Sequence, residues 1–311
     1  MRQECKIVVF GSFVVDLTGH CQKLPVPGET VLGTSFKMGP GGKGSNQAVA
    51  AHRAGGDIVL VTKLGKDVFG EVARDFYRAE GMRSDYLLTD DTMETGTALI
   101  LVDEQNGQNM ILVTIGPCGN ITPADVRKNE ALIQNADLLL VQLEINLDAL
   151  AMVIRTAHAS GTTVILNPAP ARALDDELLS MVDIITPNET EAATLTGVEI
   201  ETRQDAAAAA RVLFQKGVKQ VIITMGGKGV YVNDGTRDEM IPAIAVSVVD
   251  TTGAGDAFNG GLVTALSERR DLFDAARFGN CTAALSVTAP GTAPSMPMRR
   301  EIDALYRRQI K

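Results

Sequence analysis

A short glycine-rich turn, Asp250-Thr-Thr-Gly-Ala-Gly-Asp256, carries an acid at each end. The apolar stretch 241–249 predicts an extended segment before the turn, and helical spacing of apolar residues in 257–266 predicts a helix after it. Free backbone N–H groups at a helix start attract anions, and glycines let an anionic group come close because they lack a Cβ. Asp256 could cap this helix, or act as general base toward a hydroxyl that attacks a phosphate. The turn alone leaves both open.

The bulk composition excludes several classes of protein. The 311 residues include 29 Lys and Arg against 38 Asp and Glu, so the net charge of −9 gives no footprint for nucleic acid or an anionic membrane. The four cysteines form no C-x-x-C pair, which favours a reducing cytosol over a disulfide framework. The sequence has no apolar run of membrane-spanning length, and we expect no N-terminal signal sequence because residues 1–6 lack an apolar core. We therefore expect a cytoplasmic protein that binds neither nucleic acid nor membranes.

Short runs rich in valine and isoleucine alternate with helical patterns along most of the chain. The predicted strands of this kind are 7–10, 58–62, 138–141, 164–166, 184–186 and 221–224. This alternation predicts a doubly wound α/β fold, with a mostly parallel sheet covered by helices on both faces. A strand at 31–38 and a hairpin of 97–102 with 109–114 break the rhythm. They predict a small β-sheet lid, formed by about 13–38 and 97–115 and inserted within a single domain of residues 1–311.

Polar or glycine-rich segments follow the predicted strands at six places. They are Asp16, 39–46, Glu144, Asn188 with Glu191, 224–229 and 250–256. Ligands of open α/β sheets bind at the carboxyl ends of the strands, so we expect all six segments to line one crevice. This convergence favours a general base over a simple helix cap for Asp256.

The glycines at 39, 41 and 44 match G-x-G-x-x-G and raise the alternative of an NAD-dependent oxidoreductase. The match lies outside the first βα turn, and no acid follows it at the spacing expected for a ribose contact. The oxidoreductase hypothesis also leaves Asp256 and its turn without a role. A catalytically silent sugar-binding protein is a third possibility, against which the presence of both Asp256 and Glu191 argues.

Four motifs make the chain resemble the ribokinase or PfkB-type carbohydrate kinases over nearly its whole length. The motifs are Gly41-Gly-Lys-Gly-Ser-Asn46, Asn167-Pro-Ala-Pro-Ala-Arg172, Asn188-Glu-Thr-Glu191 and Asp250-Thr-Thr-Gly-Ala-Gly-Asp256. The resemblance implies transfer of the ATP γ-phosphate to the primary hydroxyl of a pentose, with a homodimer formed through the lid. Another small sugar or a nucleoside is the alternative acceptor within the same family.

The resemblance also implies a role for individual residues. The catalytic group would be Asp256 as general base, with the amides of Gly253, Ala254 and Gly255 as an anion hole. The sugar site would contain Val14, Asp16, Gly42, Lys43, Gly44, Asn46 and Glu144, and the nucleotide site Asn188, Thr224, Gly226, Gly229 and Asn280. Glu191 would hold Mg²⁺ through water, and K⁺ would lie among Asp250, Thr252, Ser286, Ala289, Gly291 and Ser295.

One position departs from the ribokinase pattern. Ribokinases resemble Gly-Ser-x-Asn-x-Asp at the end of the first strand, whereas this chain has Gly11-Ser-Phe-Val-Val-Asp16, so Val14 replaces a sugar-binding asparagine. Deoxyribokinase-like members of this branch also carry an apolar residue there. A site that hydrogen-bonds a hydroxyl discriminates by about 10⁴–10⁵, whereas an apolar wall rejects an added hydroxyl by only about 10². We therefore expect a pentose kinase that prefers a deoxy- or otherwise altered sugar to ribose.

Overall fold

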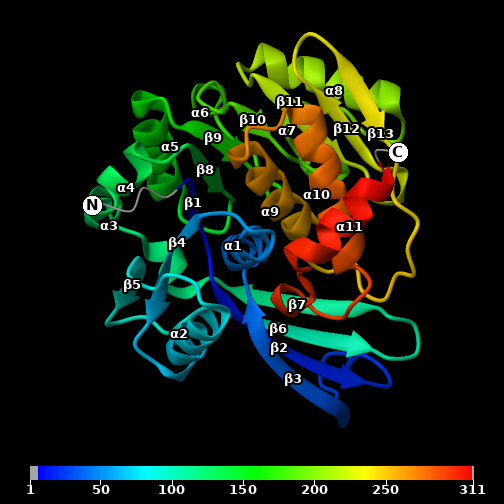
Figure 1. Ribbon diagram of the computed structural model, residues 1–311. Helices are drawn as coiled ribbons and strands as arrows, with labels where there is room; N and C mark the ends of the chain where they lie inside the picture. Colours follow the sequence, from blue (N-terminus) through cyan, green and yellow to red (C-terminus); the bar gives the residue numbers. More distant parts are fainter. Residues whose placement is uncertain (1–5, 310–311) are drawn as a thin grey trace.

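The structure is a computed structural model that describes residues 6–309. Cys5, and the N-terminal residues on which the expectation of no signal sequence depends, lie outside the described residues. Two sheets organise the described chain, a large sheet between two helix layers and a smaller one to one side (Figure 1).

The large sheet has the strand order β13-β12-β11-β10-β9-β8-β1-β4-β5. Its strands are β1 (Ile7–Phe10), β4 (Ile58–Gly65), β5 (Leu87–Asp90), β8 (Leu138–Val141), β9 (Thr163–Leu166), β10 (Ile184–Ile185), β11 (Gln220–Thr224), β12 (Val230–Asn233) and β13 (Asp238–Ile241). The strands from β5 to β11 are parallel, and β12 and β13 add an antiparallel edge. The predicted mostly parallel sheet is confirmed.

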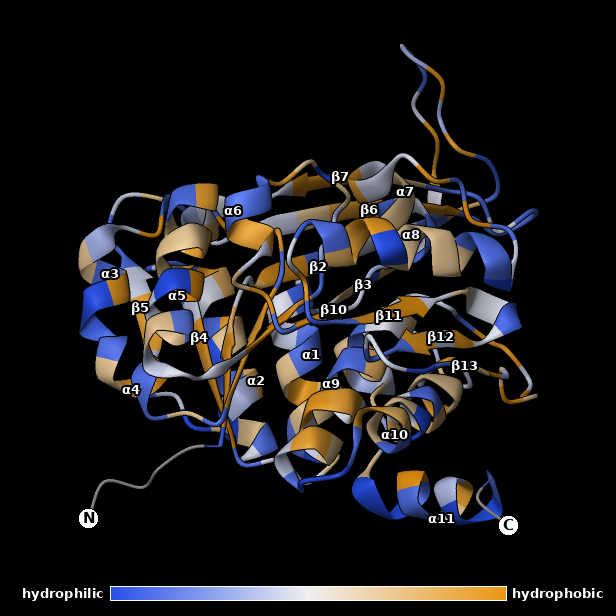
Figure 2. Ribbon diagram, turned by 90° about the horizontal axis from the view of Figure 1, so that it is seen from above, coloured by the Kyte–Doolittle hydropathy of each residue, from blue (hydrophilic) through white to orange (hydrophobic). Residues whose placement is uncertain are grey.

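Alternate residues of each buried strand face two separate cores. In β1, Val8 and Phe10 join one core while Ile7 and Val9 join the other, because successive side chains of a strand point to opposite faces. The first core is covered by α3 (Pro123–Lys128), α4 (Glu130–Gln134), α5 (Leu147–Ser160), α6 (Asp176–Leu179), α7 (Glu189–Thr196) and α8 (Arg203–Gln215). The second is covered by α1 (Lys43–Arg53), α2 (Val68–Glu80), α9 (Ala254–Ser267), α10 (Leu272–Ser286) and α11 (Arg299–Gln309). Figure 2 shows hydrophobic strands between these layers, and hydrophilic residues on outer helices such as α8 and α11.

The small sheet has the order β3-β2-β6-β7 and projects from the main body (Figure 1). Its strands are β2 (Val14–Cys21), β3 (Gly33–Gly41), β6 (Thr97–Asp103) and β7 (Asn109–Thr114). The predicted hairpin of β6 and β7 is present, with Thr97 opposite Thr114. Apolar side chains remain exposed on this sheet: Phe36, Met38, Leu99, Met110, Ile111, Leu112 and Val113.

Three local predictions were wrong. The stretch 241–249 forms no strand beyond Ile241 at its start, which alone pairs within the sheet. Asp16 lies inside β2 rather than beyond a strand end, and Gly39 to Gly41 form the end of β3 rather than following a strand. The 39–46 segment thus overlaps a strand of the small sheet, and 250–256 follows no strand at all. Across residues 6–309, no helix is long and apolar enough to cross a membrane.

Candidate active site

The start of α1 is fixed against the end of β1 by close backbone packing. A Cβ on Gly44 would lie 2.5 Å from the backbone nitrogen of Ser12, and Gly42 has a φ of 88° that favours glycine. Glu144, which follows β8, accepts hydrogen bonds at Oε2 from the Lys43 backbone N–H (2.9 Å) and the Ser12 hydroxyl (2.5 Å). Gly42 and Gly44 therefore allow the first turn of α1 to lie at the edge of the sheet.

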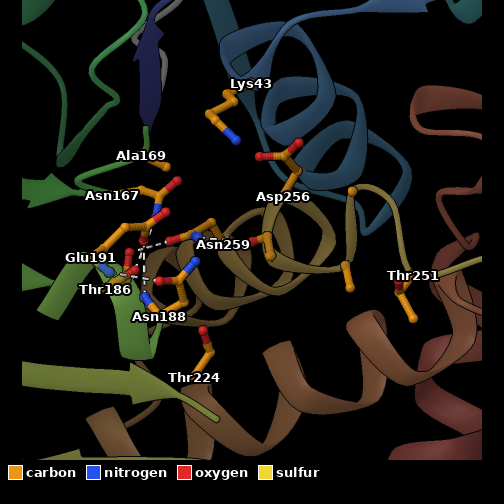
Figure 3. Close-up of a pocket in the computed structure, with 13 residues that line it drawn as sticks. Lys43, Asn167, Ala169, Thr186, Asn188, Glu191, Thr224, Thr251, Asp256 and Asn259 are labelled. Carbon is orange, nitrogen blue, oxygen red and sulfur yellow. Dashed lines mark hydrogen bonds between the residues drawn. The ribbon is translucent and has the colours of Figure 1, made fainter. Parts of the chain in front are cut away.

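A cavity of about 160 Å³ lies where α1, α7 and α9 meet the carboxyl ends of the central strands. Lys43 and Asp256 line it together with Glu191 and the turn 253–255. In Figure 3, the Lys43 ammonium points toward the Asp256 carboxylate, and Asn188 and Glu191 lie across the cavity from them. The opening is therefore lined by acids, a cation and backbone amides, a set that suits a phosphate and its counter-ions.

Asp256 does not act as a helix cap. Gly253, with φ 78°, is the N-cap of α9, and the cap has no side-chain hydrogen bond. Each Asp256 carboxylate oxygen instead accepts an amide N–H from α1, from Asn46 Nδ2 and Gln47 Nε2, both at 2.9 Å. Asp256 is 6 % exposed, and this burial raises its pKa. Lys43 and the two amide donors favour the ionised carboxylate and so partly offset the rise. A raised pKa suits a group that must accept a proton near neutral pH.

Lys43, which was expected at the sugar site, lines the smaller cavity together with Asp256 and Glu191. Burial by itself would lower its pKa, but Asp256, Glu144 and Glu191 together raise the pKa above its ordinary value. The ammonium therefore keeps its charge. Burial raises the pKa of Glu191, whose Oε2 also accepts the backbone N–H of Asn188 at 2.9 Å.

The expected sugar-binding acid Asp16 contacts two distant segments. A Cβ on Gly41 would lie 2.1 Å from Asp16 Oδ1, so the carboxylate lies directly over the glycine backbone. The Thr292 hydroxyl contacts Asp16 Oδ2 and the Pro40 carbonyl, both at 3.2 Å. Burial raises the pKa of Asp16 to about 6; Thr292 opposes this shift, and Glu144 and Asp256 add to it. Val14 is 3 % exposed and pairs with Gly41 across β2 and β3.

A larger pocket of about 400 Å³ adjoins the first cavity and shares Asn188, Thr224, Thr251, Ala254 and Gly255 with it. Gly226, Gly229 and Asn280 line this pocket, together with aliphatic residues of 243–248 and α10. Gly229 must stay small, because a Cβ there would lie 2.0 Å from the Ile241 carbonyl oxygen. Asn280 donates to the Pro242 carbonyl (2.9 Å) and so ties α10 to the 242–250 segment. A flat apolar ring with a phosphate tail would fit the two joined cavities.

The motif Asn188-x-x-Glu191 has a structural role as well. The Asn188 side chain accepts the Glu191 backbone N–H (2.8 Å), and Glu191 accepts the Asn188 backbone N–H, which makes a capping box at the start of α7. The box turns one carboxylate oxygen of Glu191 inward, toward the helix end. The residue nevertheless lines the cavity, so capping and ligand binding are compatible.

The residues expected around K⁺ belong to two segments that lie side by side. The Val287 carbonyl accepts the backbone N–H groups of Val249 and Asp250, and Gly291 donates its N–H to Asp250 Oδ2 at 2.9 Å. Thr252 donates its backbone N–H to Asp250 Oδ1, also at 2.9 Å. Ser286 and Ser295 are buried, and their hydroxyls donate to the carbonyls of Ala283 and Thr292. Asp250, Thr252, Gly291 and the segment 286–291 are thus brought together.

Sequence reasoning found the carboxylates of this site but missed most of its buried amides and hydroxyls. The missed residues are Gln47, Thr186, Asn259 and Thr292, and Asn167 was noticed only for its motif. Asn167 and Thr186 directly follow β9 and β10, so the strand-end rule that singled out Glu144 could have found them. Within the described residues, no group of three His, Cys, Asp or Glu could hold a metal alone.

Residues 5–299 match the model of the pfkB family carbohydrate kinases. This chain belongs to that family. Among relatives, it is 42 % identical over 295 residues to the ribokinase of Haemophilus influenzae, covering 95 % of this chain and 96 % of the relative. It is 36 % identical over 292 residues to the deoxyribokinase of Salmonella typhi, with 94 % and 95 % covered. The structure of Arabidopsis thaliana ribokinase complexed with ribose and ATP superposes with a TM-score of 0.89 at 31 % identity, covering 98 % of this chain and 99 % of that one.

Membership in a carbohydrate kinase family decides between the two enzyme classes raised by the sequence. The glycines at 39, 41 and 44 lie where a strand of the small sheet runs into α1, rather than in a βα turn of the parallel sheet. The oxidoreductase alternative therefore has neither the topology nor the family that it needs. The chain is a carbohydrate kinase.

Proposed function

We propose that this kinase transfers the γ-phosphate of ATP to the primary hydroxyl of a ribose- or 2-deoxyribose-type pentose. The observation that carries the proposal is the cavity where a buried carboxylate, a cation and a glycine turn at a helix start meet. The names of the relatives, which include ribokinases and deoxyribokinases, support a pentose as acceptor and ATP as donor.

In this proposal Asp256 takes the proton of the attacking hydroxyl. The amides of Gly253, Ala254 and Gly255 would stabilise charge on the transferred phosphoryl group, and each such donor is worth about 10²–10³ in rate. Lys43 lies beside Asp256 at the same cavity, so its charge would compensate the phosphate as well as the neighbouring acids. It would therefore act at the phosphate, not only at the sugar as its motif implies.

The larger pocket is the proposed site for the adenosine part of ATP. Asn188, Thr224, Gly226, Gly229 and Asn280 line it, and it opens directly onto the phosphate cavity. Mg²⁺ keeps much of its hydration in nucleotide sites and needs few protein ligands. Of the two acids on α7, only Glu191 lines the smaller cavity. A single carboxylate there fits a magnesium ion that is held mainly by water and the phosphates. The ion would neutralise charge as the phosphoryl group is transferred.

K⁺ is proposed for the region between 250–252 and 286–295. The donor set fits, because a carboxylate, buried hydroxyls and backbone carbonyls are hard oxygen ligands of the kind alkali cations take. Asp250, Thr252, Ser286, Ala289, Gly291 and Ser295 would supply them. A cation there would set the backbone of the turn that carries the anion-hole amides.

The sugar is proposed to lie between β2, the start of α1 and Glu144. Asn46 contributes an acceptor that has no partner in the structure, since its Oδ1 is buried without a hydrogen bond. Such an atom is costly unless a ligand hydroxyl binds it. Val14 presents an apolar side chain at the neighbouring position of β2, which supports a preference for 2-deoxyribose over ribose.

The test is ADP release with ribose, 2-deoxyribose, fructose, sugar phosphates and nucleosides, each with and without K⁺. We expect turnover with pentoses, a higher kcat/KM for 2-deoxyribose than for ribose, and a faster rate in K⁺. Val14→Asn should then shift the preference toward ribose. A wild-type kcat/KM for ribose well above that for 2-deoxyribose would refute the preference, and no ADP release with any acceptor would refute the function.

We also propose that two copies pair through the small sheet, which closes each site as a lid. Three of its apolar residues, Phe36, Met110 and Leu112, are more than half exposed. Exposed apolar sheet faces of this kind usually mark an interaction surface. Sedimentation velocity should give a dimer mass, and a monomer at micromolar concentration would contradict the pairing.

A further inference from the structure

A chain of buried side-chain amides runs beneath the carboxylate of Asp256. Gln142 follows β8, Gln47 lies in the second turn of α1, and Asn167 follows β9. Gln142 Nε2 donates to Gln47 Oε1 (2.6 Å), and Gln47 Nε2 is 2.9 Å from both Asn167 Oδ1 and Asp256 Oδ1. Gln47 and Gln142 are 0 % exposed and Asn167 is 6 % exposed. We call these three residues the amide chain.

Chemistry fixes the orientation of the Gln47 amide. If its oxygen and nitrogen were exchanged, the oxygen would face two other acceptors, the Asp256 carboxylate and Asn167 Oδ1. The Oε1 atom of Gln47 must therefore face Gln142. Because Oε1 is an acceptor, Gln142 must donate a hydrogen bond to it from its N–H₂ group. Gln142 Oε1 is left buried without a partner, 2.2 Å from where a Cβ on Gly11 would lie. A buried acceptor without a partner lowers the free energy of unfolding, so this orientation of the two amides costs stability.

The amide chain continues to the other side of the turn. Asn167 Nδ2 donates to the Thr186 carbonyl (2.9 Å), and the Thr186 hydroxyl donates to Asn259 Oδ1 (2.7 Å). Asn259 Nδ2 then donates to the Gly255 carbonyl at 2.8 Å. One set of buried bonds thus reaches both the carboxylate of Asp256 and the backbone of the preceding residue, which belongs to the proposed anion hole.

From this geometry we infer that Gln47 is a positioning residue, which aims the Asp256 carboxylate at the acceptor hydroxyl through the amide chain. The inference rests on the proposed role of Asp256 as base. Asn46 is the other donor to Asp256, and its own Oδ1 has no partner among the described residues, so Asn46 keeps an acceptor for the sugar. Gln47 has both of its polar atoms committed within the protein. Gln47 therefore has no polar atom left for the sugar, and it acts on the reaction only through Asp256.

Removal of this donor should raise the pKa of Asp256, because the Gln47 N–H stabilises the ionised carboxylate. The charged groups that face Asp256 are Lys43 from α1, Glu144 after β8, Glu191 from α7 and Asp16 from β2. None of these is changed by a substitution at Gln47. A shift in the titration of Asp256 would therefore report the lost amide.

The test compares Gln47→Met with the double variant Gln47→Met/Gln142→Met. The single variant should lower kcat by about 10- to 100-fold with the KM of sugar and ATP nearly unchanged, as expected for a misdirected base. The acidic limb of the kcat–pH profile should move up by about one unit, the size of a lost hydrogen bond to a charged group. Because the double variant leaves fewer amides unpaired, it should regain thermal stability but keep the shifted limb.

A purely structural role predicts the opposite for the double variant, namely recovery of kcat and of the limb along with stability. That result, or an unshifted limb in a folded single variant, would overturn the inference. Difference infrared spectroscopy of the substrate-free proteins, with Asp256→Asn as blank, measures the protonated carboxyl directly. It should show the same upward shift. This signal needs no turnover, so it tests the inference even if the proposed pentose reaction fails.

Discussion

Two carboxylates face the same crevice, but the elements that hold them differ. Asp256 is on α9 and takes two amide donors from α1, a helix packed closely against α9. Asp16 is on β2 of the small sheet and takes a single hydroxyl from the 291–295 loop. We call Asp256 with its donors from α1 the floor of the site, and Asp16 with the 291–295 loop its rim. The carboxylate at the floor is held between two packed helices, whereas the carboxylate at the rim accepts a side-chain hydrogen bond from one loop residue. The difference suggests that chemistry is set at the floor and affinity for the sugar at the rim.

The largest effect should follow from a change at the floor. Asp256→Asn keeps the size of the side chain but cannot accept the hydroxyl proton, so kcat should fall by about 10²–10⁴. The KM values for sugar and ATP should change by no more than a few-fold, because the substituted asparagine would still fill the same space. Steady-state ADP release with the best pentose, alongside thermal melting, provides the measurement. A variant with unchanged turnover would remove Asp256 from the chemistry.

The floor could be predicted from sequence better than the rim. Its strands are buried on both faces and are therefore near-continuous valine and isoleucine runs, which give the parallel sheet and its carboxyl edge. The partly buried strand Val14–Cys21 does alternate, with Asp16, Thr18 and His20 on one face and Val15, Leu17 and Cys21 on the other. Asp16 was nevertheless predicted only as an acid beyond the end of the first strand. The apolar run 242–249 looked like a strand, but it lines the larger pocket instead of pairing.

The contacts around each carboxylate were harder to predict than its position. Gln47 lies in an alanine-rich helix with no local pattern that marks a buried glutamine as special. Thr292 and Asp16 are 276 positions apart, and no spacing rule joins residues that only the tertiary fold brings together. The motifs thus located the acids, whereas the donors that tune them became visible only in the structure.

A smaller effect is expected from pH at the rim. The pKa of Asp16 is raised to about 6, so the ionised acceptor form predominates at neutral pH and is lost as the pH falls below 6. The KM for the sugar should be flat above that value and rise up to about tenfold per pH unit below it. Initial rates from pH 5 to 8 at saturating ATP would measure it. In the Asp16→Asn variant, the sugar KM should be high at every pH and should not rise further below pH 6. A wild-type KM that stays constant down to pH 5 would contradict the assignment of this rise to Asp16.

The smallest effect should come from the contact that distinguishes rim from floor. Thr292→Val removes the hydroxyl from Asp16 with little change in shape, so the sugar KM at neutral pH should rise about 2- to 10-fold. The KM limb should also move to higher pH, because the hydroxyl favours the ionised carboxylate. Thr194→Val is the matched control, since its exposed hydroxyl bonds only the Thr190 carbonyl among the contacts described. If both variants raise KM equally, the Thr292 hydroxyl is not what supports the rim. If neither does, Asp16 is held as firmly as Asp256, and the contrast between floor and rim fails.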